Sequence, residues 1–219
     1  SLTDREIDAI ARRIVADIGD EPAAQAEAPA AERPFAAGTG VYATVDEAVQ
    51  AARRAQPAFA RLPLKARAQV ISAIRRTMIE HAAALAKAAH DETGLGRVED
   101  KVVKNLLVTE KTPGLEDLFP QAVTGDHGLS LIEPAPFGVI GAITPVTNPT
   151  STIICNAIGM LSAGNAVVFN VHPAARRCSI QTVALLNAAI QAAGGPPDVV
   201  TCVGQPSIET AQETMRHRG

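Results

Sequence analysis

The residue types that most often act in catalysis are few in this chain of 219 residues. Each of its three cysteines, Cys155, Cys178 and Cys202, lies inside or beside an apolar segment, so we predict buried, reduced structural thiols and no disulfide framework or CxxC site. Cys178 follows two arginines, Arg176 and Arg177, which could lower the pKa of its thiol, but we still favour a structural role. The five histidines do not have metal-ligand spacing, and we predict no metal site.

A polar turn offers a better candidate for chemistry. It reads TPVTNPTS at residues 144–151 and lies between an apolar run and a helical segment. The free N–H groups of a helix amino terminus and the carboxamide of Asn148 could donate to a negative or polarised oxygen. From its spacing alone, we favour an ordinary turn or cap residue for Asn148. No G-x-G-x-x-G pattern occurs here, so a glycine loop that binds phosphate is not indicated.

The elements around this turn alternate between apolar runs and helical segments. We predict strands at 137–143, 166–171 and 198–203, each buried on both faces, and helices at 151–163, 176–193 and about 206–216. This βαβαβα order predicts an α/β fold with a doubly wound parallel sheet. Ligands of such sheets bind beyond the carboxyl ends of the strands, where the turn lies.

Helical patterns also precede the first of these strands. A capping box at Thr44 begins a helix that extends to about Gln56, a longer helix runs from Pro63 to Gly94, and a third covers Val98–Lys111. We interpret the charged residues at 91–104 as a solvated helical face. Residues 115–136 read as extended structure, with an antiparallel excursion near 120–136.

The first 34 residues predict a short helix followed by a linker. Thr3 and Glu6 form a capping box, and isoleucines 7, 10, 14 and 18 recur at helical spacing. Residues 20–34, DEPAAQAEAPAAERP, have little to bury and read as a linker. We therefore divide the chain into an amphipathic helix at 1–19, a Pro/Ala-rich linker at 20–36 and a domain at 37–219. The apolar stripe must be covered by a partner or by the chain's own domain.

Composition narrows the classes of function. The formal net charge is −3, without a basic stripe for nucleic acid, and no apolar run is long enough to span a membrane. We expect a cytoplasmic protein with a small-molecule ligand.

Several long motifs resemble one family. The stretch FGVIGAITPVTNPTSTIICNAIGMLSAGNAVVFNVHPAA at 137–175 is similar to the aldehyde dehydrogenases, specifically the CoA-acylating propionaldehyde or acetaldehyde dehydrogenases of bacterial microcompartments. Matching motifs, in the same order, are TVDEAV at 44–49, DETGLGRVEDKVVKN at 91–105, EKTPG at 110–114 and TGDHGLSLIE at 124–133. The resemblance covers nearly the whole chain and implies the truncated cofactor-binding domain of that fold, without its catalytic domain.

The resemblance also implies chemistry. In the family a cysteine attacks a short-chain aldehyde, NAD accepts hydride, and coenzyme A takes the acyl group. We expect that cysteine to lie beyond residue 219, and the chain alone to be inactive. Asn148 matches the asparagine that donates to the oxyanion. The residues implied to lie beside the cofactor are Ile143, Thr144, Pro145, Val146 and Asn148 at the first turn, Asn170, His172, Pro173 and Ala174 at the second, and Gln205 and Pro206 at the third.

The resemblance further implies a homo-oligomer through the 120–136 excursion, and a location inside a microcompartment, with residues 3–18 as an encapsulation peptide that binds shell or core proteins. Two alternatives stay open. One is a hydrolytic aldehyde dehydrogenase, although those enzymes usually carry Pro-Trp-Asn and Lys-Pro where this chain has Pro145-Val146-Thr147-Asn148 and Asn170-Val171-His172-Pro173. The other is a nucleotide-binding or scaffold protein without catalysis.

Overall fold

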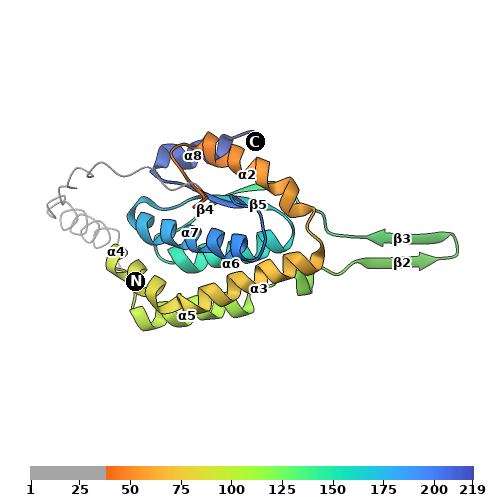
Figure 1. The fold of residues 1–219 in the computed structure, drawn as a ribbon, viewed down its shortest axis with the longest axis horizontal. Helices are drawn as coiled ribbons and strands as arrows, with labels where there is room; N and C mark the ends of the chain where they lie inside the picture. Colours follow the sequence, from red (N-terminus) through yellow and green to blue (C-terminus); the bar gives the residue numbers. More distant parts are fainter. Residues whose placement is uncertain (1–37) are drawn as a thin grey trace, which may run out of the picture. The chain divides into compact units, whose positions relative to one another are not determined.

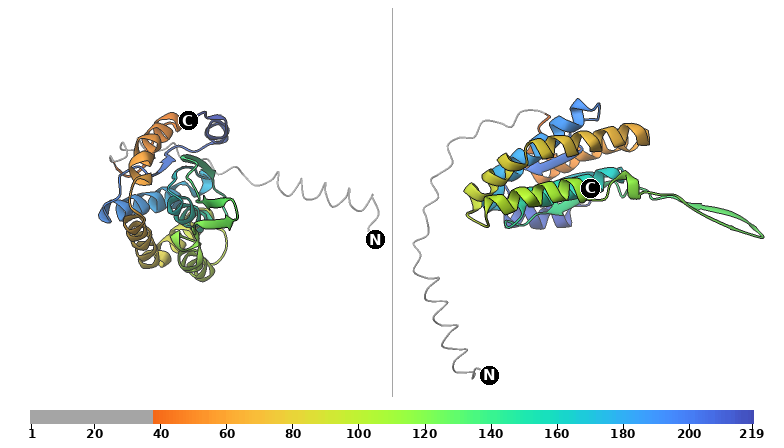
Figure 2. Two further views of the ribbon diagram at one scale, coloured as in Figure 1. Left: turned by 90° about the vertical axis from the view of Figure 1, so that its right-hand side faces the viewer. Right: turned by 90° about the horizontal axis from the view of Figure 1, so that it is seen from below.

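The computed structural model describes residues 38–219, which form a parallel sheet covered by helices on both faces (Figures 1 and 2). The doubly wound α/β architecture predicted from the alternating pattern is therefore confirmed. The helix predicted at 3–18 and the linker at 20–34 lie outside the described residues.

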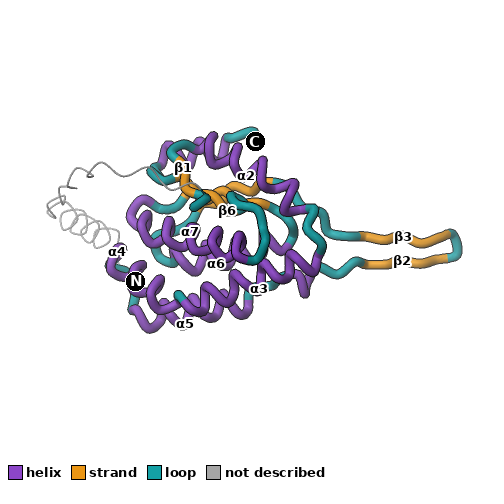
Figure 3. The backbone as a smooth tube through the Cα atoms, in the orientation of Figure 1, coloured by secondary structure: helices purple, strands orange, loops and turns teal. Residues whose placement is uncertain are grey.

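The sheet has four parallel strands in the order β1-β6-β5-β4. Figure 3 draws the strands in orange and labels β1 and β6, which pair with each other. The strands are β1 (Val41–Tyr42), β4 (Val139–Ile143), β5 (Ala166–Asn170) and β6 (Val200–Val203). Sequence analysis did not predict β1, because a strand of two residues is too short to show periodicity. It forms by pairing with β6: the N–H of Cys202 in β6 donates to the carbonyl of Gly40, and the N–H of Gly204, just after β6, donates to that of Tyr42, each at 2.7 Å.

The strands differ in how far they are buried. All residues of β5 and β6 are buried, as their continuous apolar runs predict. The prediction that the first run would also be buried on both faces is wrong, because β4 lies at the edge of the sheet and exposes Gly141 and Ile143. At the edge of the sheet a strand has a neighbouring strand on one side only, so the elements that pack on the two faces cover it less completely.

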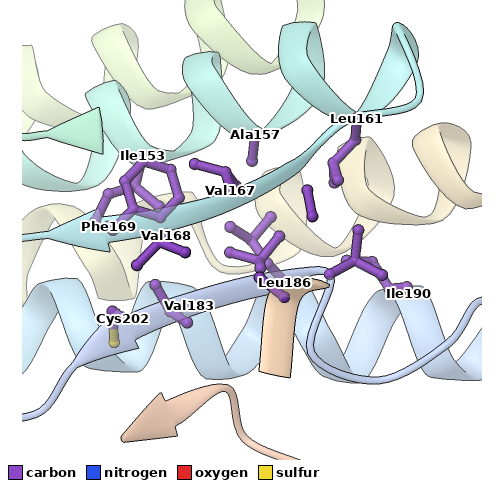
Figure 4. Packing of buried hydrophobic residues seen from close by; sticks show 14 of the residues in the cluster. Ile153, Ala157, Leu161, Val167, Val168, Phe169, Val183, Leu186, Ile190 and Cys202 are labelled. Atoms are coloured by element: carbon purple, nitrogen blue, oxygen red, sulfur yellow. The ribbon is translucent and has the colours of Figure 1, made fainter. Parts of the chain in front are cut away.

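Helices pack on both faces of the sheet. On one face lie α6 (Pro149–Ser162) and α7 (Arg176–Ala192), and on the other lie α2 (Val45–Ala60) and α8 (Ile208–Arg216). Figure 4 shows the core on the α6 and α7 side, where leucines and isoleucines of the two helices surround β5. Phe169 of β5 and Leu161 and Leu186 of these helices are completely buried, and each such side chain contributes about 1.5–3 kcal/mol by leaving water.

The outer helices form a further layer against α6 and α7. They are α3 (Leu64–Glu80), α4 (Ala82–Thr93) and α5 (Val98–Lys111). The single helix predicted from Pro63 to Gly94 is wrong, because His81, with φ −99° and ψ 3°, separates α3 from α4. The interruption redirects the chain so that α4 packs on both α5 and α7. The helix predicted for 98–111 is confirmed.

Helix α2 also exceeds its predicted end. The predicted end, near Gln56, directly precedes Pro57, which cannot donate a helical hydrogen bond. The helix nevertheless continues through Pro57 to Ala60. Phe59 is completely buried in the last turn, so core packing offsets the missing hydrogen bond.

The excursion predicted near 120–136 is a β-hairpin that extends away from the sheet and helices (Figures 1 and 2). After a short 3₁₀ turn at Leu115–Asp117, strands β2 (Gln121–Gly125) and β3 (Gly128–Ile132) pair in antiparallel register. Every residue of both strands is exposed, including Leu129 at 69 % and Leu131 at 61 %. Hydrophobic side chains so far from a core are typical of a surface that another protein covers.

Candidate active site

Three turns meet at the carboxyl edge of the sheet. They follow β4, β5 and β6, and parallel pairing brings them side by side. The N–H of Thr144 donates to the carbonyl of Asn170 at 3.2 Å, which joins the first turn to the second. The guanidinium of Arg176 donates to the carbonyl of Gly204, which joins the second to the third. The structure therefore brings together the three turns in which all the predicted site residues lie.

Asn148 directly precedes α6, at the N-cap position, but its side chain makes no capping hydrogen bond. Its Oδ1 instead accepts a hydrogen bond of 2.6 Å from Nζ of Lys104. The residue is half-buried, and within residues 38–219 its Nδ2 makes no hydrogen bond to the protein. The side chain of Asn148 therefore does not cap α6, although the residue stands at the N-cap position. The carboxamide has an anchored oxygen and an available donor.

Helix α5 forms hydrogen bonds to this turn. Lys101, buried at 7 % exposure, donates from Nζ to the carbonyl of Thr147 at 3.1 Å. Asn105, also buried, accepts from the hydroxyl of Thr150 at 3.0 Å. Burial, followed by repulsion from Lys104, lowers the pKa of Lys101. Positions 101, 104 and 105 lie on one helix face. This face of α5 therefore binds the residue before Asn148, its side chain and the residue two positions after it.

A pocket of about 260 Å³ opens beside Asn148. Its other lining residues come from α5 and α6, and they are Lys104, Val108, Ser151, Thr152, Cys155 and Asn156. Cys155 is half-buried and lines this pocket, so the prediction that its thiol is buried is wrong. Its thiol lies on the outer face of α6, two helical turns after Asn148, and not on the face that packs against the sheet.

The rest of the first turn has a mixed environment. Ile143 is 48 % exposed, Pro145 is exposed, and Val146 packs against a small apolar cluster around Cys178. Thr144 is 3 % exposed, and its hydroxyl has no hydrogen-bond partner among the described residues. Ile143 and Pro145 thus present apolar surface at the sheet edge, while Thr144 holds a buried polar group without a partner.

The second turn divides into an exposed part and a buried part. His172, Pro173 and Ala174 are exposed, and Nδ1 of His172 accepts from the Ala174 N–H at 3.1 Å. Asn170 is only 2 % exposed, and its Oδ1 accepts from the hydroxyl of Thr210 at 2.7 Å. The carboxamide of Asn170 therefore ties β5 to α8, and the exposed residues of this turn are the ones that a ligand can contact.

The third turn presents Gln205, which is exposed, whereas Pro206 is buried at the start of α8. Ser207 caps that helix and forms a capping box with Thr210. Of the two residues predicted at this turn, only Gln205 therefore offers a side chain to a ligand at the surface.

Glu92 is a structural partner of the site that sequence reasoning missed. Its carboxylate, 11 % exposed, accepts from the N–H groups of Arg177 and Cys178, each at 2.7 Å. The interpretation of residues 91–104 as a solvated helical face is therefore wrong for Glu92 and Lys101, because both side chains are largely removed from solvent. Burial, followed by the Glu92 carboxylate, raises the pKa of Cys178 to about 12, so the neighbouring arginines do not activate this thiol.

The described part of the chain contains no cluster of three or more His, Cys, Asp or Glu side chains arranged to hold a metal ion. It also contains no helix with the length and apolar character needed to cross a bilayer.

Comparison with known proteins places this arrangement in a family. The sequence pattern of the Aldehyde dehydrogenase family matches residues 20–219. The chain belongs to the aldehyde dehydrogenase family. This membership agrees with the resemblance seen in the sequence, and the conserved fold confirms the aldehyde dehydrogenase-like architecture.

Within the family, the chain is similar to CoA-acylating enzymes. It is 49 % identical over 180 residues to acetaldehyde dehydrogenase (acetylating) EutE of Salmonella typhimurium, covering 82 % of this chain and 38 % of that protein. It is 49 % identical, with a TM-score of 0.80, to the structure of a propionaldehyde dehydrogenase from the Clostridium phytofermentans fucose utilisation bacterial microcompartment, covering 82 % of this chain and 41 % of the other.

A third relative is a crystal structure of Rhodopseudomonas palustris propionaldehyde dehydrogenase with bound CoA and an acylated cysteine. Its identity is 47 % and its TM-score 0.80, and the match covers 82 % of this chain and 42 % of the other. The chain thus spans about two fifths of the length of these aldehyde dehydrogenases.

The sequence contained a pattern that could have indicated the residues of α5 that bind the turn, although we did not use it. Lys101, Lys104 and Asn105 have i, i+3 and i+4 spacing, which places them on one face of a predicted helix. Nothing in that spacing names the partner of the face, because the residues that it contacts lie 44 to 46 positions away.

Proposed function

We propose that this chain forms the nucleotide-facing part of an NAD-dependent, CoA-acylating aldehyde dehydrogenase. The complete enzyme oxidises a short-chain aldehyde, such as propionaldehyde, to the acyl-CoA, and its nucleophilic cysteine lies outside these 219 residues. The observation that carries the proposal is the carboxamide of Asn148, which is anchored by its oxygen beside a pocket at the carboxyl edge of the sheet.

The role of Asn148 follows from its free donor. When a thiolate adds to an aldehyde carbonyl, negative charge develops on the carbonyl oxygen. A side-chain N–H that is already oriented stabilises this charge without reorganising during the reaction. Because Oδ1 is bound to Lys104, Nδ2 is the part of the carboxamide that can meet the oxyanion.

The adjoining pocket suits the aldehyde. Ser151, Thr152 and Cys155 follow Asn148 along one side of α6 and line the pocket with it. The side chains of these three residues are small, which leaves room for a short substrate. Neither Cys178 nor Cys202 fits the role of nucleophile, because both are buried with pKa values raised to about 12.

The sheet edge offers groups that fit the cofactors. Exposed Ile143 and Pro145 supply an apolar surface for a flat ring, and the unpartnered hydroxyl of Thr144 lies at the end of β4. The exposed turn at His172–Ala174 and Gln205 would contact the adenosine end. When bound, NAD accepts hydride and coenzyme A accepts the acyl group. Asn170 would act indirectly, since its carboxamide holds β5 to α8.

Replacing Asn148 by alanine in the complete enzyme tests the proposal. We expect kcat to fall by about a hundredfold or more, because the amide acts on charge that develops in the transition state, while the affinity for NAD changes little. Gln50→Ala, which removes a carboxamide from α2 on the opposite face of the sheet, is the control and should leave kcat unchanged. Unchanged turnover with weaker NAD binding in Asn148→Ala would assign the residue to the cofactor instead.

The products distinguish the acylating reaction from hydrolysis. With aldehyde and NAD, acyl-CoA should appear only when coenzyme A is added. Release of the free carboxylic acid at the same rate with and without coenzyme A would identify a hydrolytic enzyme.

The exposed hairpin supports assembly into a homo-oligomer. Leu129 and Leu131 share one hairpin face with Ala122 and Thr124, and Val123 and Ile132 lie on the other. We propose that β2 and β3 pack against a second copy of the chain, because both faces carry apolar side chains that the described chain leaves in solvent.

We also propose that the enzyme works inside a bacterial microcompartment, in the cytoplasm. The similarity to a propionaldehyde dehydrogenase from such a compartment supports this location. The isoleucine stripe predicted at residues 3–18 would bind a shell protein or a core enzyme.

A further inference from the structure

The contacts of helix α5 point to a function for a lysine that lies outside the predicted site. Lys104 donates to Oδ1 of Asn148 at 2.6 Å, although the two residues are 44 positions apart. On either side of this contact, Lys101 holds the carbonyl of Thr147 and Asn105 holds the hydroxyl of Thr150. Three side chains of one helix therefore bind the backbone before Asn148, its side chain, and the residue two positions after it.

The chemistry of these groups determines which way the carboxamide points. A carboxamide has an acceptor oxygen at one end and a donor NH₂ at the other, and the two ends have almost the same shape. A lysine ammonium can only donate, so it can meet Asn148 only through Oδ1. Rotation of the carboxamide by half a turn would place NH₂ against the ammonium, which is repulsive. Lys104 thus selects one of two nearly equivalent orientations.

The same contact also strengthens the donor. A positive charge at the carboxamide oxygen draws electron density from the nitrogen, so the N–H groups become better donors to an anion. Hydrogen bonds that involve a charged partner are about twice as strong as neutral ones. Orientation and polarisation therefore act in the same direction on Nδ2.

We propose that Lys104 is a positioning residue that orients and polarises the Asn148 carboxamide, with Lys101 and Asn105 fixing the backbone around it. The inference rests on the proposed role of Asn148 in stabilising the oxyanion. Lys104 itself does not contact the reacting atoms and acts through Asn148.

A double-mutant cycle in the complete enzyme tests this inference. Lys104→Met keeps most of the side-chain length and removes the ammonium. We expect it to lower kcat by about tenfold, the loss of one hydrogen bond to a charged group, with KM for NAD and for coenzyme A nearly unchanged. In an Asn148→Ala background the same change should lower kcat less than about twofold, because the group through which Lys104 acts is gone.

Two further variants sharpen the cycle. Lys104→Arg, which also only donates, should recover part of the lost kcat. Lys111→Met removes an exposed positive charge from the same helix, away from the pocket, and should leave kcat unchanged. Equal losses in kcat from Lys104→Met with and without Asn148 would overturn the inference and show that Lys104 acts on substrate or cofactor directly.

A readout without activity completes the test. In the ¹⁵N-labelled 219-residue chain, the side-chain NH₂ signals of Asn148 are assigned by their loss in Asn148→Ala. They should shift in Lys104→Met and stay in place in Lys111→Met. Unmoved signals in Lys104→Met would refute the contact itself. If the signals shift but Asn148→Ala has full turnover in the complete enzyme, the proposed role of Asn148 fails, and the role of Lys104 in catalysis fails with it.

Discussion

Replacing Glu92 by alanine should destabilise the start of α7. The loss should be larger than that from removing one exposed charge elsewhere on the surface. Ala175, at the N-cap position of α7, has no side chain that could bind the free N–H groups of the first turn. Glu92, at the end of α4, takes this role, with one carboxylate oxygen on the Arg177 N–H and the other on the Cys178 N–H. The cap is therefore supplied by a residue 85 positions earlier in the chain.

The magnitude follows from these two contacts. Loss of an N-cap side chain typically costs about 0.5–2 kcal/mol, and a carboxylate at the positive end of a helix adds about 0.3–1 kcal/mol. Because Glu92 is only 11 % exposed, water replaces its oxygens poorly. We therefore expect Glu92→Ala to lower the free energy of unfolding by about 2 kcal/mol.

Urea unfolding of the 219-residue chain measures this loss. For an m value of about 2 kcal/mol/M, the midpoint should fall by about 1 M. Asp91→Ala is the matched control, since it removes the same charge from the adjacent residue. Asp91 is 53 % exposed and, among residues 38–219, is paired only with Lys87, which predicts a change of about 0.5 kcal/mol or less.

A second consequence can be measured at the Cys178 thiol. Burial is the larger cause of its raised pKa and persists in Glu92→Ala, but the contribution of the neighbouring carboxylate disappears. The pKa, followed by the ultraviolet absorbance of the thiolate, should thus fall below about 12 and stay above its ordinary value. Equal midpoints for Glu92→Ala and Asp91→Ala, with an unchanged Cys178 pKa, would refute the cap.

Three further results are expected. Of the three thiols, Cys155 should react first with a water-soluble reagent. Cys178 and Cys202, with pKa values of about 12, are neutral in the folded chain, and burying them in that form contributes to the free energy of unfolding. Alkaline unfolding should show this contribution in full below about pH 8.5 and its loss as the pH rises toward 12. Leu131→Asp places a charge on the exposed hairpin and should shift the complete enzyme toward smaller species in sedimentation, whereas an unchanged oligomer would exclude this face. Deletion of residues 1–20 should abolish co-purification with microcompartment shells and leave aldehyde oxidation near normal; retained co-purification with lower stability would instead indicate a helix folded onto its own domain.

Much of the fold could be predicted from local patterns. The continuous apolar runs of β5 and β6, the helix at 98–111 and the antiparallel excursion all depend on residues that are neighbours in the chain, so periodicity and turn residues were sufficient. The same holds for the place of Asn148. A polar residue between a parallel strand and the next helix must lie at the carboxyl edge of the sheet, whatever surrounds it.

The details that determine the chemistry depend on contacts between distant residues. The Lys104 contact that orients Asn148 and the Glu92 cap on α7 join positions 44 and 85 residues apart, and no local pattern names such partners. The same limit explains the exposed edge of β4 and the half-buried thiol of Cys155, because burial depends on which other elements pack against a segment. The sequence thus placed the carboxamide of Asn148 at the carboxyl edge of the sheet, and only the tertiary structure decided which end of that carboxamide is free to donate, since the ammonium that binds the other end comes from a different helix.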